Sequence, residues 1–187
     1  MNSKLKTRTN DRTHIRLTAV LLATCTGLFA LPSTGLPEDA DAPIVIRADA
    51  GQFDQKTNKA TYNGNVQVDQ GTLRVNADRM VVDRQDQKVT SITFYGAPAT
   101  YKQQLNANDD VVRGRANTIT YYTQDEVLNL DGQAFLTQQG NEVRGDSIKY
   151  DIVAGRVNAD SKPDSGPIQI VIPPDPDRKR NSKSSSR

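Results

Sequence analysis

Three aspartates recur in the same local sequence and are the first candidates for chemistry. Asp49, Asp78 and Asp146 each follow a small residue, and pairs of carboxylates carry out glycoside hydrolysis. Another copy of the pattern has Asn117 at this position, and an amide cannot act as a general acid. Asp and Asn share a side-chain oxygen that accepts hydrogen bonds from backbone N–H groups in turns. We therefore expect structural turn positions, with a carbohydrate hydrolase as the alternative.

Other side chains suited to catalysis or metal binding are scarce. His14 is the only histidine and Cys25 the only cysteine, and both lie in an N-terminal segment that export would remove. The rest of the chain has no imidazole or thiol for a Ser-His-Asp site, a Cys-His site or a zinc site. Two loops rich in Asp and Asn lack the spacing of a calcium loop. The sequence predicts no catalytic residue, no metal and no cofactor.

The N-terminus has the composition of a secretory signal. Five basic residues precede an apolar run from Leu17 to Leu31, which a proline and small residues follow. This order predicts a cleaved signal peptide over residues 1–35, because fifteen apolar residues are fewer than the about 20 that span a bilayer. An uncleaved anchor and acylation of Cys25 are the alternatives. Export without disulfides favours a bacterial periplasm.

Charge is unevenly distributed along the chain. Residues 1–35 contain five basic residues and one acidic residue, so residues 36–187 carry 19 basic and 21 acidic side chains. Five of these basic residues and two of the acidic ones lie in residues 175–187, which leaves the preceding part acidic. Nucleic-acid-binding domains are usually basic. We therefore expect no nucleic-acid partner.

From Ile44 onward, apolar and polar residues alternate with a period of two. Segments such as NVQVDQ, TLRVNADRMVVD and NTITYY are rich in Val, Ile, Thr and Tyr, and the turn signals NG, QG, DG and YGAP separate such segments. No window shows sustained helical spacing. We predict a linker over residues 36–43, an all-β domain over residues 44–172 and a disordered basic tail over residues 173–187.

One phrase recurs along this domain. A small residue followed by Asp or Asn occurs at residues 48–49, 77–78, 116–117 and 145–146, and in the first three copies a glycine follows the small residue after 16, 19 and 16 positions. A unit of this size cannot bury its own apolar face. We expect repeated antiparallel hairpin units stacked edge to edge as a two-sheet sandwich or jelly roll, with the phrase at a repeated corner.

The alternating apolar residues define one face of these strands. We expect this face to carry Ile44, Ile46, Val66, Val68, Leu73, Val75, Met80, Val82, Ile92, Phe94, Tyr101, Ile119, Tyr121, Leu128, Leu130, Phe135, Ile148, Tyr150 and Ile152. An ordinary sandwich core is one interpretation. A groove between sheets that part at one edge is the other, and it would suit acyl chains, because each buried CH₂ contributes about 0.8 kcal/mol.

Several segments resemble one family. The phrases PIVIRAD, YNGNVQVDQGTLRVNADRMVV, YGAPATY, VRGRANTITYY, LDGQAFLTQQGNEVRGDSIKYD and IQIVIPP span Pro43 to Pro174 and closely resemble the LptA/OstA-like family of periplasmic lipopolysaccharide-transport proteins. The resemblance implies an open, twisted β-jelly roll, located in the periplasm and without enzymatic activity. It also implies that lipid A acyl chains bind between the sheets.

The resemblance further implies which residues contact lipid. Positions matching the family's lipid path are Ile44, Ile46, Arg84, Tyr101, Tyr121 and Thr123. The guanidinium of Arg84 would lie at the groove mouth and could pair with phosphate. The apolar face adds the predicted lipid-binding residues Val66, Val68, Val75, Val82, Phe94, Ile119, Leu130 and Tyr150.

The predicted first and last strands suit a bridging role. The segments PIVI and IQIVI are apolar and uncharged, whereas exposed edge strands are usually blocked by charge or proline. The resemblance implies head-to-tail self-association, an LptC-like inner-membrane component and an LptD-like outer-membrane translocon as partners. A head-to-tail contact that does not close gives a filament. An LptC-like, inner-membrane-anchored component with the same fold is the alternative.

Overall fold

The computed structural model describes residue 39, residues 41–105 and residues 110–174. The predicted signal peptide and all but the first two residues of the predicted tail lie outside these ranges. The elements within them are β1 (Val45–Arg47), β2 (Ala50–Asp54), β3 (Lys59–Gln70), β4 (Leu73–Gln85), β5 (Lys88–Gln104), β6 (Val111–Tyr122), β7 (Val127–Gln138), β8 (Asn141–Asp151), β9 (Arg156–Asp160), η1 (Pro163–Ser165) and β10 (Gln169–Val171). Among these described residues, no helix is long and apolar enough to cross a membrane.

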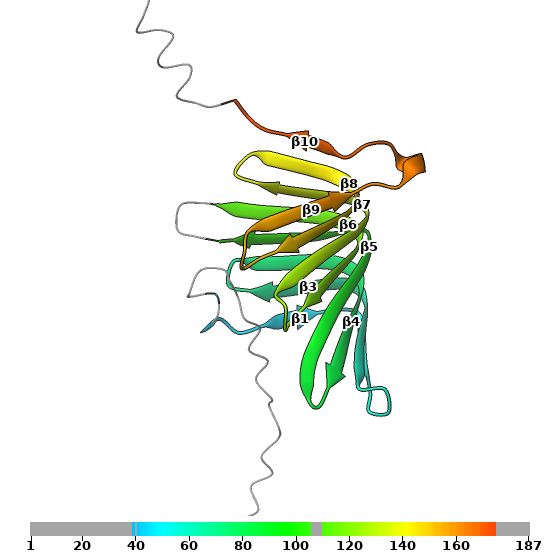
Figure 1. The fold of residues 1–187 in the computed structure, drawn as a ribbon. Coiled ribbons are helices and arrows are strands. Elements are labelled where there is room, and N and C mark those ends of the chain that lie inside the picture. Colours follow the sequence, from blue (N-terminus) through cyan, green and yellow to red (C-terminus); the bar gives the residue numbers. More distant parts are fainter. Residues whose placement is uncertain (1–38, 40, 106–109, 175–187) are drawn as a thin grey trace, which may run out of the picture.

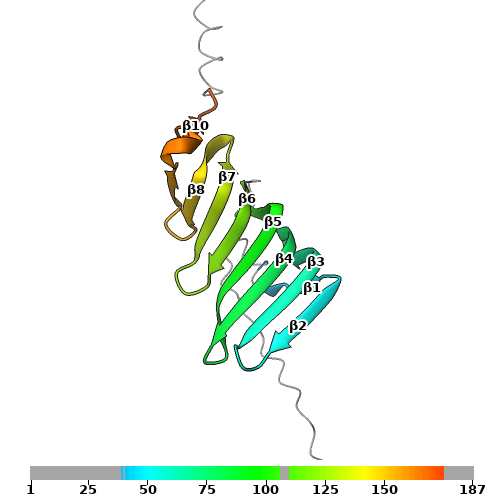
Figure 2. The same ribbon diagram turned by 90° about the vertical axis from the view of Figure 1, so that its right-hand side faces the viewer.

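All strands form one antiparallel sheet, as the alternation of the sequence predicts. The order is β1-β3-β4-β5-β6-β7-β8-β10, with β2 also beside β3 and β9 also beside β8. Figure 2 shows the strands stacked in chain order, from β1 and β2 at one end to β10 at the other. The structure therefore has two free ends, and each end carries two short strands.

Each long strand shifts its register near its middle, and this divides the sheet into two halves. Bulges at these shifts bend the strands. Half A consists of β1, β10 and the segments 66–70, 73–77, 99–104, 111–116, 134–138 and 141–145. Half B consists of β2, β9 and the segments 59–63, 79–85, 88–95, 118–122, 127–131 and 147–151. The halves meet along one side and diverge from it, forming an open β-jelly roll (Figure 1).

The recurring phrase lies at the corner between the halves. Asp49 N–H donates to the Gly64 carbonyl (2.9 Å), and Asn65 Nδ2 donates to the Asp49 carboxylate (2.8 Å). In a later copy Asn117 lies against Gly132 in the same arrangement. Gly64 and Gly132 both have positive φ, of 75° and 79°. The phrase recurs because the chain turns the same corner repeatedly.

Small side chains let the halves converge at this corner. Ala99 pairs with Ala116, and both side chains are fully buried. Ala134 on β7 and Ala77 on β4 are also buried. Farther from the corner, Gly114 in half A lies close to half B, because a Cβ on Gly114 would be 2.9 Å from a methyl carbon of Leu130. Larger residues at these positions would force the halves apart.

A substitution at the corner should be costly. A Cβ on Gly64 would lie 2.2 Å from the Asp49 carboxylate, and the backbone there has φ of +75°. We expect Gly64→Ala to lower the free energy of unfolding by about 2–3 kcal/mol, through steric overlap added to backbone strain. Urea denaturation measures this. Gly155→Ala is the control, because Gly155 has φ of +61° but no atom within 4 Å of the added Cβ. Gly155→Ala should lower the free energy of unfolding by about 1 kcal/mol. An equal loss of stability in both variants would contradict a steric overlap between the added Cβ at position 64 and Asp49.

The interior contains side chains from both halves in one cluster. Ile119, Leu130 and Ile148 of half B are fully buried, and Val68, Val75 and Leu136 of half A pack in the same cluster. The apolar face predicted from the sequence lies on this interior, with one exception. Phe135 pairs with Arg115 and Arg144 on the outer surface, because the alternation that places Leu128 and Leu130 inward keeps its phase across the register shift of β7. Ala134 and Leu136 take the interior positions instead.

Candidate functional site

Apolar rows run through the interior from one end of the stack to the other. In half A, cross-strand partners form the row Ile46, Val68, Val75, Tyr101, Gly114, Leu136, Val143 and Ile170. In half B, they form the row Phe53, Ala60, Val82, Ile92, Tyr121, Leu128, Tyr150 and Val157. We call these the half A row and the half B row. Both rows are continuous across the whole sheet.

Burial along the rows is graded. Within the half A row Val75 and Leu136 are 3% and 2% exposed, and within the half B row Leu128 and Tyr150 are 2% and 1% exposed. The ends of the half A row, Ile46 and Ile170, are 40% and 58% exposed. Phe53 and Val157, which end the half B row, are 47% and 36% exposed. The interior is therefore filled by its own side chains between the row ends and open to solvent at both ends.

Most of the predicted lipid-binding residues are brought together in this interior. The buried members are Val66, Val68, Val75, Phe94, Tyr101, Ile119, Leu130 and Tyr150. Ile44, Val82 and Tyr121 are partly buried and pack against the same cluster. Ile46 extends the half A row at the exposed end formed by β1.

Arg84 and Thr123 lie apart from this cluster, near the hairpin tips of half B. An Arg84 guanidinium nitrogen donates to the Gln87 carbonyl (3.1 Å), and the guanidinium lies 5.8 Å from the Phe53 ring. The Thr123 hydroxyl donates to the Val89 carbonyl at 2.6 Å. Thr123 therefore ties two hairpins together, while Arg84 lies beside the aromatic end of the half B row.

Tyr101, Tyr121 and Tyr150 in the interior remain uncharged over the physiological range. Burial raises the pKa of Tyr121 to about 12, and it also raises the pKa of Tyr101 and of Tyr150. The Tyr101 hydroxyl donates to the Gln103 side chain (2.5 Å), which is itself buried. The buried surface around these tyrosines is therefore uncharged, and its polar groups include phenol hydroxyls and the Gln103 amide.

The three aspartates of the recurring phrase lie at the corner rather than in the interior. Asp49 and Asp78 are exposed, and Asp49 is bonded to the neighbouring corner. Asp146 accepts a hydrogen bond from Lys162 N–H (2.5 Å), and this bond lowers the pKa of its carboxyl group. This arrangement favours the structural interpretation over the hydrolytic one. Within the described residues, no group of His, Cys, Asp and Glu side chains could hold a metal ion.

Three row-end residues were not among the sequence-predicted site residues. Phe53, Val157 and Ile170 end the two rows, and their exposure marks where a ligand or a neighbouring molecule would contact the interior. Only the alternation within AGQFD, RVNAD and IQIVI signals them in the sequence. Burial at the end of a row depends on whether another strand follows, which the local sequence does not show.

The chain matches known proteins along most of its length. A profile of the LptA/(LptD N-terminal domain) LPS transport protein family matches residues 45–156. The lipopolysaccharide export system protein LptA of Escherichia coli (strain K12) is 32% identical over 156 residues, covering 82% of this chain and 84% of that protein. LptH of Pseudomonas aeruginosa (strain PAO1) is 35% identical over 127 residues, which is 66% of this chain and 71% of LptH.

A solved structure agrees with these sequence matches. The crystal structure of LptH from Pseudomonas aeruginosa, described as the LptA-homologous periplasmic component of the lipopolysaccharide transport device, superposes with a TM-score of 0.66 at 33% identity. The match covers 74% of this chain and all of the LptH chain. The resemblance noted in the sequence is therefore confirmed. The chain belongs to the LptA/(LptD N-terminal domain) LPS transport protein family.

Proposed function

We propose that this protein is a non-enzymatic carrier that binds lipopolysaccharide by its acyl chains between halves A and B. The observation that carries the proposal is the pair of apolar rows, which are continuous through the molecule and exposed at both ends. Family membership gives the cargo class. Burial of each CH₂ contributes about 0.8 kcal/mol, so acyl chains can be held without any catalytic group.

Lipid entry requires the halves to separate. Packed side chains fill the interior between the row ends, so an acyl chain must displace packing between the halves to enter. The register shifts at the corner are the natural hinge, because the halves have independent ladders of hydrogen bonds on either side of them. The acyl chains would then cover the apolar side chains that the two halves cover for each other in the lipid-free protein. Arg84, near the hairpin tips, can meet a phosphate group.

We further propose that identical units join end to end. An odd number of antiparallel steps separates β1 from β10, and likewise β2 from β9. The two ends of each half therefore run in opposite directions, and a second copy in the same orientation can continue both ladders by antiparallel strand addition. The same geometry suits related jelly rolls on an LptC-like inner-membrane component and an LptD-like outer-membrane translocon.

Photo-crosslinking tests the lipid path. A photoreactive residue at Ile44, Ile46 or Tyr121 should give lipopolysaccharide adducts in cells, because these positions line the interior where it is open or partly open. The same residue at Lys149, exposed on the outer surface of half B, is the control and should give few adducts. Adducts at Lys149 equal to those at all three interior positions would contradict the proposed path.

The proposed location is the periplasm, after removal of residues 1–35. N-terminal sequencing of protein purified from cells should begin close to Leu36. Retention of Met1 would instead favour the membrane-anchored, LptC-like alternative, and the jelly roll would then be tethered at its β1 end.

A further inference from the structure

Three cations lie directly opposite one another on the outer surface of half A. Arg74 on β4 pairs with Lys102 on β5, and Lys102 pairs with Arg113 on β6. All three are exposed, because they alternate with interior residues such as Tyr101 and Val112. Like charges directly opposite in a sheet are destabilising. We call Arg74, Lys102 and Arg113 the cation row.

Acidic side chains of the protein neutralise positive charge only at or beyond the two ends of the cation row. Asp69 pairs with Arg74 and with Arg47, each at 2.7 Å, and its hydrogen bond from Arg74 lowers the pKa of its carboxyl group. Beyond the other end, Glu142 pairs with Arg144 at 3.0 Å. Lys102 and Arg113 form no ion pair with any residue in the ranges that the structure describes.

A stack of guanidinium groups adjoins the cation row. Arg115 and Arg144 lie over the Phe135 ring, with their guanidinium carbons 4.8 Å and 4.9 Å from its centre. Stacking occupies the planar faces of guanidinium groups and leaves their N–H edges available for bidentate hydrogen bonds. The stacking on Phe135 therefore fixes the orientation of Arg115, which lies on the same surface of β6 as Arg113.

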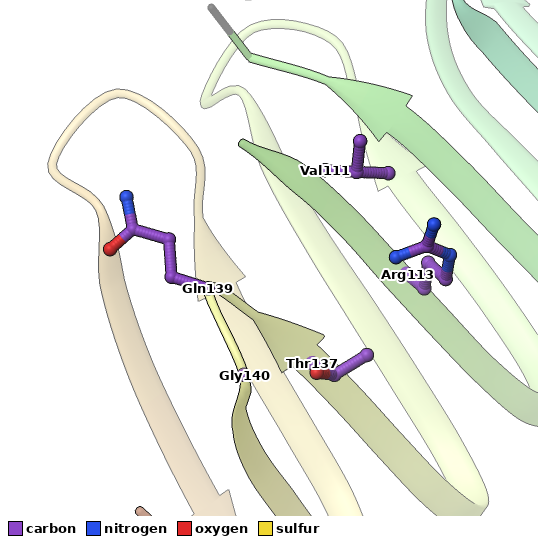
Figure 3. A pocket seen from close by; sticks show the side chains of 5 residues that line it. All are labelled: Val111, Arg113, Thr137, Gln139 and Gly140. Atoms are coloured by element: carbon purple, nitrogen blue, oxygen red, sulfur yellow. The ribbon is translucent and has the colours of Figure 1, made fainter. Parts of the chain in front are cut away.

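Hollows lie at both ends of the cation row. One, of about 380 Å³, is lined by Val111, Arg113, Thr137, Gln139 and Gly140, and Figure 3 shows Arg113 beside Thr137 on the next strand. A second, of about 220 Å³, is lined by Asp69, Gly71, Thr72, Leu73, Arg74 and Lys102. Both lie near the hairpin tips of half A, where the two halves have diverged from the corner.

The outer surface of half B has a different pattern. Lys59 on β3 has Asp54 on β2 and Asp83 on β4 as its cross-strand partners, and it forms a 2.6 Å ion pair with Asp83. Lys149 has Asn129 and Asn158 as its cross-strand partners. Adjacent uncompensated cations are thus a feature of half A rather than of the whole surface.

We propose that the cation row, with Arg115, binds the phosphate groups of the lipopolysaccharide headgroup. The inference rests on the proposed function: with acyl chains between the halves, the headgroup lies at their diverging tips, a few residues from the row. The row presents positive charge at intervals of about 4.8 Å, the spacing of strands, and guanidinium groups match phosphate geometry. The cation row faces outward, so the headgroup would reach it by extending around the hairpin tips of half A.

Binding of two forms of the lipid tests this inference. The probes are lipopolysaccharide and the same lipid after enzymatic removal of its phosphates, titrated against the full protein. The wild-type protein should bind the phosphorylated form about tenfold more tightly. The double variant Lys102→Gln/Arg113→Gln should lose most of this preference, because only Arg74, Arg115 and Arg84 remain to contact phosphate. The control Lys88→Gln/Lys149→Gln removes the same charge from half B and should keep the tenfold preference.

The outcomes separate this inference from the proposed function. If the wild-type protein binds neither form, the proposed function fails. If Lys102→Gln/Arg113→Gln keeps the preference for phosphate, or the control loses it equally, the cation row is not the phosphate site. A variant that loses only the binding of an acidic partner protein, with lipid binding intact, would also overturn the inference. Thermal unfolding at low salt should show the variant at least as stable as wild type, because like-charge repulsion is removed.

Discussion

The double variant Ile170→Lys/Val157→Lys is expected to convert end-to-end assemblies into single molecules. Ile170 on β10 and Val157 on β9 end the two rows at the same end of the stack, and both are exposed. A lysine at each position would bring charge into a seam that must bury apolar surface, which is how natural proteins block edge strands. Sedimentation velocity over a range of concentrations should show wild-type species growing with concentration and the variant remaining monomeric.

A matched control separates edge charge from charge in general. Val153→Lys/Tyr122→Lys adds the same two lysines at exposed apolar positions, one in the turn after β8 and one on the outer surface of β6. This control should assemble like wild type. Assembly of the Ile170→Lys/Val157→Lys variant at wild-type concentrations would show that β9 and β10 do not form the seam.

The largest loss of stability is expected at a fully buried position of the interior. Ile148 is fully buried and pairs with Leu130 and Ala159 in half B. Ile148→Ala should lower the free energy of unfolding by about 2–5 kcal/mol, because the methylene groups removed leave a cavity between two packed halves. Urea denaturation of the lipid-free protein measures this, and the slope of the transition should stay unchanged.

The same substitution at a row end should behave differently. Ile46→Ala removes the same atoms from a side chain that is 40% exposed, so it should cost less than about 1 kcal/mol. Its effect should instead appear in lipid binding and in assembly, since Ile46 lies where the interior opens. Equal stability losses in Ile148→Ala and Ile46→Ala would mean that the difference in burial between the interior and the row end does not affect stability.

Local patterns in the sequence were sufficient to predict the strands and the corner. Alternation between apolar and polar residues depends on neighbours in the chain, and so does the pairing of a small residue and an Asx with a later glycine. The exchange of Asp for Asn at position 117 indicated a turn rather than an acid, and Asn117 packs against Gly132 at the corner. These features needed no knowledge of the tertiary structure.

The division into halves and the ends of the rows could not be predicted in the same way. On β6 the inward side chains change from even positions, such as Val112 and Ala116, to the odd position Ile119 across the register shift, and simple alternation does not show this. On β7 the alternation keeps its phase, so Phe135 faces outward although its apolar side chain suggested an interior position. Whether Ile46 or Val157 is buried depends on whether another strand lies beside it, and none does. The cation row likewise arises only when β4, β5 and β6 are aligned.

The paired strands at each end of the stack have a mechanical consequence. A joint made through one strand could swivel about that single line of hydrogen bonds. Here β1 and β2 belong to different halves, and so do β9 and β10. Two lines of hydrogen bonds, one in each half, would resist rotation of one molecule relative to the next. Each added molecule would therefore have the same rotation relative to the one before it, and the assembly would be a stiff helical filament that lengthens by adding molecules rather than by bending.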